Sequence, residues 1–102
     1  MSLFPLDGPS IQDSISVGTG AVVEAKVGGS VYPDRKVITI QPSGKLYVLF
    51  VEEGTTPSIS DVSTKGFLQF KNQKDTYEAG EKQKIYLLSF SGTVTVKIAE
   101  RA

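Results

Sequence analysis

The chain contains neither cysteine nor histidine. Without cysteine it can form no disulfide, no thiolate zinc site and no cysteine nucleophile. Without histidine it lacks the commonest general base and the commonest ligand of catalytic zinc. Paired carboxylates, a serine–lysine pair or a tyrosine base are the routes to catalysis that stay open. We therefore expect a protein that is not an enzyme and that uses neither a metal nor a cofactor.

An excess of charge of one sign and long apolar runs are also missing. Eleven lysines and arginines balance eleven aspartates and glutamates, so the formal net charge is zero. A neutral chain lacks the positive field that attracts proteins to nucleic acid. No apolar run approaches the ~20 residues of a membrane-spanning helix, and the opening MSLFPLDGPS lacks the pattern of a signal peptide. We expect no binding to nucleic acid or membrane, and a protein that acts where it is made.

The first 19 residues differ in pattern from the rest of the chain. Prolines and glycines interrupt them, and the apolar residues stand singly. We interpret residues 1–19 as an extended arm that precedes a domain of residues 20–102. Such a segment can place single side chains in pockets of a partner or add a strand to its sheet. The predicted interface residues of the arm are Leu3, Phe4, Leu6, Ile11 and Ile15.

From residue 20 onward the apolar residues recur every second position, which is typical of β-strands. We expect strands in residues 21–27, 36–41, 45–51, 66–70, 75–79, 84–90 and 93–100, with a surface loop in residues 55–65. The turns at Ser43-Gly44 and Ser91-Gly92 predict two hairpins. About seven short strands without a helical segment predict an all-β fold, a single antiparallel β-sandwich.

Two of these strands, LYVLFV and IYLLSF, are apolar on both faces. A small sandwich usually covers only one face of each sheet, so the second face is predicted to pack on another surface. Tyr47 and Tyr86 are the candidate interface residues. The alternative is that both tyrosines lie half-exposed with their hydroxyl groups in water, and the sequence does not separate the two.

The acidic residues of the loops are candidates for a calcium site. Glu52, Glu53 and Asp61, with Glu78 and Glu81, could supply oxygen ligands, but no stretch has the alternating ligands around a glycine that calcium loops use. Solvated acids are the favoured interpretation. Ser43 and Lys45 are likewise expected to belong to a turn, because a catalytic lysine must be buried and neutral.

Four segments together resemble small β-sandwich virion proteins of tailed bacteriophages. They are a strand from Arg35 to Gln41, an aromatic-rich strand from Leu46 to Phe50, a Gly-hydrophobic strand from Gly66 to Phe70, and a terminal segment from Ile85 to Glu100. The resemblance lies in strand order and turn placement over residues 32–100, and it includes no catalytic motif.

The resemblance implies a structural protein of the virion, assembled in the host cytoplasm. The expected role is a decoration or cement protein that binds the major capsid protein, bridges capsid subunits and forms a homo-oligomer, a trimer being favoured. Two alternatives stay open. One is an adaptor of the phage tail or neck, and the other is a carbohydrate-binding or adhesive sandwich with Tyr32, Tyr47, Tyr77 and Tyr86 as its platform.

Overall fold

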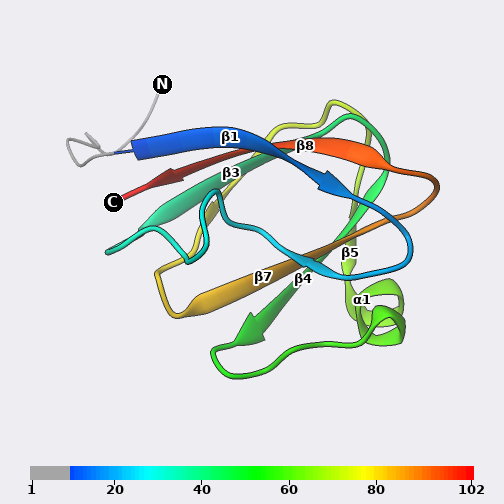
Figure 1. Cartoon of the computed structure of the whole chain (residues 1–102), viewed down its shortest axis with the longest axis horizontal. Helices are drawn as coiled ribbons and strands as arrows, with labels where there is room; N and C mark the ends of the chain where they lie inside the picture. Colours follow the sequence, from blue (N-terminus) through cyan, green and yellow to red (C-terminus); the bar gives the residue numbers. More distant parts are fainter. Residues whose placement is uncertain (1–9) are drawn as a thin grey trace.

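Residues 10–102 of the computed structural model are described, and they form two four-stranded antiparallel sheets packed face to face (Figure 1). Sheet A has the order β1-β8-β3-β6, and sheet B has the order β2-β7-β4-β5. The elements are β1 (Ser10–Val17), β2 (Val23–Glu24), β3 (Val37–Pro42), β4 (Leu46–Glu52), α1 (Ile59–Lys65), β5 (Phe67–Gln69), β6 (Asp75–Glu78), β7 (Gln83–Ser89) and β8 (Val94–Arg101). No helix in this described part of the chain is long and apolar enough to cross a membrane.

Consecutive strands alternate between the sheets, except that β5 follows β4 in sheet B. This order, with eight strands in two sheets, is that of a jelly roll. The predicted all-β sandwich is therefore confirmed, with eight strands in place of about seven and with one helix.

The core lies between the sheets and follows the period of two. In β8, Val94, Val96 and Ile98 point inward, and the residues between them are exposed or only partly buried. Sheet B contributes alternate residues of β4 and β7. The fully or almost fully buried residues of this core are Val17, Ala25, Ile38, Ile40, Leu46, Val48, Ala79, Ile85, Leu87, Val94, Val96 and Ile98.

Both predicted hairpins are wrong. β3 pairs with β6 and β8, whereas β4 pairs with β5 and β7, so the Ser43-Gly44 turn crosses from sheet A to sheet B. The Ser91-Gly92 turn likewise joins β7 of sheet B to β8 of sheet A. The turn residues indicated a reversal of the chain correctly, but a reversal between sheets uses the same residue types as one within a sheet.

These two turns cross from one sheet to the other, and we call them the arches. They meet at one end of the sandwich, the arch end. Ser43 donates its backbone N–H to the carbonyl oxygen of Thr95 (2.8 Å), and its hydroxyl accepts from the Thr95 N–H (2.9 Å). Phe90 donates its N–H to the carbonyl oxygen of Lys45 (3.1 Å). At Gly44 an added Cβ would lie 2.7 Å from Cγ1 of Val94, so this close approach requires glycine.

The predicted surface loop in residues 55–65 contains α1. Ser58 caps the helix: its hydroxyl accepts from the Asp61 N–H, and the Asp61 carboxylate accepts from the Ser58 N–H. This second hydrogen bond is the main cause of the lowered pKa of Asp61.

The helix α1 packs on β4 and β7, and its buried Val62 lies outside the main core. By alternation from Leu87, the buried Leu88 faces outward, so α1 covers part of the outer face of sheet B.

Two predicted boundaries differ from the structure. Ser10–Val17 pairs along its whole length with β8, so these residues belong to the sandwich and not to an arm of residues 1–19. The predicted strand over residues 21–27 is reduced to Val23–Glu24. After it, side-chain acceptors take the place of a neighbouring strand: the Val27 N–H donates to the carboxylate of Glu100.

We expect Gly44→Ala to lower the free energy of unfolding by about 1–3 kcal/mol, because the new methyl group overpacks the arch against the stiff Val94 side chain. Gly28→Ala is the matched control, since no atom lies within 4 Å of its added Cβ. Urea denaturation measures both. Equal stabilities of the two variants would contradict the close packing of the arches.

Candidate interaction surface

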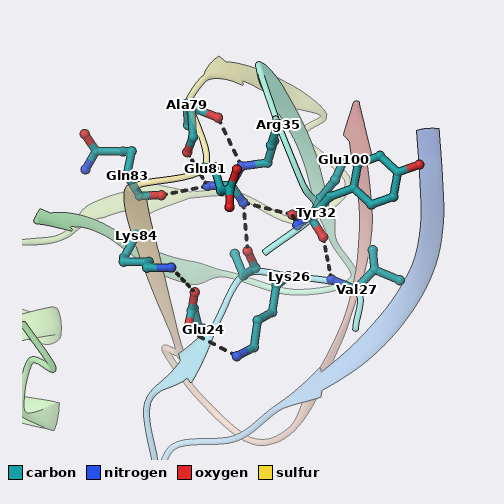
Figure 2. Close-up of polar contacts among 12 residues, drawn as sticks. Glu24, Lys26, Val27, Tyr32, Arg35, Ala79, Glu81, Gln83, Lys84 and Glu100 are labelled. Atoms are coloured by element: carbon teal, nitrogen blue, oxygen red, sulfur yellow. Dashed lines mark hydrogen bonds and ion pairs between the residues drawn. The ribbon is translucent and has the colours of Figure 1, made fainter. Parts of the chain in front are cut away.

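The end of the sandwich opposite the arch end is called the loop end. A buried ion pair lies there (Figure 2). Arg35 and Glu100 are 2% and 0% exposed, and Arg35 Nη1 is 3.0 Å from Glu100 Oε2. Arginine has five N–H donors, and here all of them have acceptors. Besides Glu100, the acceptors are the carbonyl oxygens of Ala79 (3.0 Å), Ala25 (3.4 Å), Gly80 (3.2 Å) and Gln83 (2.6 Å).

The carboxylate of Glu100 is satisfied in the same way. Its Oε1 accepts from the Val27 N–H (2.8 Å), and its Oε2 accepts from the Tyr32 N–H (3.1 Å) as well as from Arg35. The pair therefore joins the β2–β3 connection, the β6–β7 connection and the end of β8. Because both charges are enclosed and fully hydrogen-bonded, the arrangement serves the fold and offers no group to a ligand.

Acidic residues do not gather into a metal site in the described part of the chain. No group of three or more Asp or Glu residues is placed to hold an ion there. Of the acids weighed for calcium, Asp61 accepts from the N–H of the Ser58 cap of α1, and Glu81 accepts from the Asp34 N–H. Ser43 and Lys45 lie in the arch, where the Ser43 hydroxyl is used by Thr95 and Lys45 lies against aromatic rings.

The outer face of sheet A forms an open trough of about 940 Å³, lined by both polar and apolar residues. Its floor includes Thr39 and Thr76, whose hydroxyl oxygens are 2.9 Å apart and already hydrogen-bonded to each other. No aromatic side chain is among the described residues that line it; the polar ones are Gln12, Asp13, Ser14, Thr39, Gln41, Lys74, Thr76, Glu78, Lys97 and Arg101. The described lining of the trough therefore offers hydrogen-bonding groups but no aromatic ring on which a ligand could stack.

The outer face of sheet B carries an exposed aromatic patch at the arch end. The rings of Tyr47 and Phe90 have their centroids 5.7 Å apart, and Leu68 pairs with Tyr47 across β4 and β5. The Lys45 ammonium lies 4.4 Å from the ring centroid of Phe90 and 5.4 Å from that of Phe70. Phe70 is 54%, Phe90 49% and Leu68 42% exposed. We call Lys45, Tyr47, Leu68, Phe70 and Phe90 the Lys45 patch.

The predicted interface residues separate in the structure. Tyr47 belongs to the Lys45 patch, whereas Tyr86 lies further along the same face, opposite Glu24 and Leu49 in the register. Ile11 and Ile15 lie in β1, where Ile15 is packed against the core and Ile11 is 39% exposed. Leu3, Phe4 and Leu6 lie outside the described residues.

Sequence reasoning missed Phe70, Phe90 and the Arg35–Glu100 pair. Both phenylalanines end apolar strands, and only the sheet order shows that they meet at Lys45. For Glu100 a signal was present, since the alternation that turns Val96 and Ile98 inward also turns Glu100 inward.

We expect Arg35→Met to lower the free energy of unfolding by about 3–5 kcal/mol, because it leaves the Glu100 charge buried without a partner. The double variant with Glu100→Gln should recover part of this loss, since the uncompensated charge is then gone. Urea denaturation gives both values.

Lys65→Met is the control for the loss of an ion pair at the surface. Lys65 lies 3.8 Å from Asp61, with 69% of its side chain exposed, and its replacement should change stability by no more than about 0.5 kcal/mol. If Arg35→Met were as mild as this control, the buried pair would not hold the loop end together.

Comparison with known proteins yields a structural likeness and no family. No protein-family model and no curated protein matches the chain. Among solved structures, the chain is similar to a protein of the disulfide-linked pili that form Bacillus endospore appendages, with 9% identity and a TM-score of 0.40 over 99% of this chain and 96% of that chain. A likeness at this level carries no argument about function. The jelly-roll assignment rests on the strand order.

Proposed function

We propose that the protein is a non-enzymatic structural protein of a phage virion, a decoration or cement protein that binds the head surface and bridges capsid subunits. The Lys45 patch is the observation that carries the proposal. Exposed, contiguous apolar groups on a small domain are typical of a surface that another protein covers. Phe70 and Phe90 are about half exposed although both lie against a neighbouring side chain.

The architecture is compatible with this role. Jelly rolls occur in viral capsid domains, and also in lectins and cupins, so the fold supports the proposal by analogy only. The zero net charge also fits a protein that binds protein surfaces, since no positive field is available to attract nucleic acid. The major capsid protein is the proposed partner, and the proposed form is a homo-oligomer, with a trimer favoured.

A carbohydrate-binding role is the second candidate, because the trough on sheet A is concave and many of its lining side chains are polar. Its weakness is the position of the tyrosines. Tyr77 packs against the core and donates to Gln69 Oε1, whereas Tyr47 lies on the opposite sheet. They form no common platform for a sugar, so we rank this candidate below the decoration protein.

The direct test is co-sedimentation of the purified protein with phage head shells that lack it. We expect saturable binding at hundreds of copies per shell, as a decoration protein requires. A handful of copies would move the protein to the neck or tail. Absence of binding to shells, together with a hit on a glycan array, would favour the second candidate.

Phe90→Ser tests the part played by the Lys45 patch. We expect it to weaken shell binding about tenfold or more, because buried aromatic side chains dominate interface energies. Phe67→Ser is the matched control, since Phe67 is 70% exposed but lies on the opposite face of β5. Equal binding by both variants, with folding verified by circular dichroism, would contradict the role of the patch.

A further inference from the structure

The Lys45 patch combines apolar groups with one unpaired positive charge. Lys45 forms no ion pair with any residue of the described part of the chain, and its ammonium lies between the rings of Phe70 and Phe90. A complementary occupant must therefore supply apolar side chains and a nearby carboxylate. This requirement narrows the choice of partner.

The size of the patch favours a short peptide segment over a globular face. The exposed halves of Phe70 and Phe90, with Leu68 and part of Tyr47, amount to roughly 300–400 Å², judged from the 150–250 Å² that an aromatic side chain can bury. A stable protein–protein interface needs about 800 Å² from each partner. Two copies meeting patch to patch would also place one Lys45 opposite the other, which is unfavourable.

One segment of this chain has the required composition. Residues 3–7 read Leu-Phe-Pro-Leu-Asp, which places three apolar side chains directly before a carboxylate. We propose that residues 3–7 of one copy bind the Lys45 patch of a neighbouring copy, with Leu3, Phe4 and Leu6 on the aromatic rings and Asp7 beside Lys45. Residues 3–7 then fill the patch within the oligomer, so the expected effect of Phe90→Ser on shell binding arises through loss of that oligomer. The contact between copies can be tested without a phage shell.

Geometry excludes the patch of the same copy. β1 begins at Ser10 beside Arg101 and ends at Val17 beside Val94, so its seven residue steps span about 23 Å. The patch lies at the Val94 end and on the outer face of the other sheet, about 10 Å away, which makes the separation from Ser10 at least about 25 Å. The three steps from Asp7 to Ser10 reach at most about 11 Å, less than half of this separation, so Asp7 cannot lie beside Lys45 of its own copy.

A contact of this kind joins two different surfaces, one from each copy. Such head-to-tail contacts close into rings or continue as filaments, according to the rotation between copies. The closed form of this contact would be a ring of the kind expected for the proposed homo-oligomer. Self-association through residues 3–7 is thus the property to be measured, in the absence of any shell.

Sedimentation velocity of the full chain over a range of concentrations tests the proposal. The decisive comparison is between variants in which the charges of Lys45 and Asp7 are reversed singly and together. We expect Lys45→Glu and Asp7→Lys each to weaken self-association a few-fold, and the double variant to restore it. Lys82→Glu, with the same charge change in the β6–β7 turn at the loop end, should leave association unchanged. A double variant that associates no better than the single ones would overturn the pairing of Asp7 with Lys45.

Disulfide trapping tests the position of the segment, because the chain has no cysteine of its own. Phe4→Cys mixed with Leu68→Cys should give a linked dimer under mild oxidation, whereas Phe4→Cys mixed with Ser14→Cys, on the exposed part of β1, should not. Equal yields from both mixtures would overturn the proposal. A linked monomer from Phe4→Cys and Leu68→Cys on one chain at high dilution would overturn the reach argument.

Discussion

The buried ion pair between Arg35 and Glu100 is the interaction on which the loop end of this jelly roll depends. Burying two charges is costly unless both are paired and their remaining donors and acceptors are satisfied. Here the guanidinium donates five hydrogen bonds, one of them to Glu100, and the Glu100 carboxylate accepts two more from backbone N–H groups, with partners from three separate segments. In the irregular β2–β3 connection, the Val27 and Tyr32 N–H groups donate to Glu100.

The alternation of strands between the two sheets explains why the loop end needs the buried ion pair. Every connection except the one from β4 to β5 crosses from one sheet to the other, so both ends of the sandwich are built of crossing loops. At the arch end, the close approach of Gly44 to Val94 and the hydrogen bonds of Ser43 hold the crossings together. The same arches bring Lys45 and Phe90 together on the outer face of sheet B, where the Lys45 patch faces solvent.

Sequence patterns located β3, β4, β7 and β8 but not their partners, and they missed β1, which was predicted as part of an arm. The period of two indicated β3 and β8, which bury alternate residues, and apolar runs indicated β4 and β7. Neither pattern could assign them to sheets, since Ser-Gly turns serve arches and hairpins alike. The apolar character of both faces of β4 and β7 predicted a covered second face, and α1 covers part of it. Arg35 stands between Asp34 and Lys36 and looks solvated in sequence, so its burial became visible only with the fold.

Native-state hydrogen exchange is the direct test of the buried pair, because it measures the protection of the amides that donate to Glu100. Val27 and Tyr32 lie in an irregular connection, yet we expect their N–H groups to exchange as slowly as those of the central strands. Gly28, Gly29 and Ser30, which are exposed between them, should exchange rapidly. If Val27 and Tyr32 exchanged as fast as these three neighbours, the buried pair would not be what fixes the loop end.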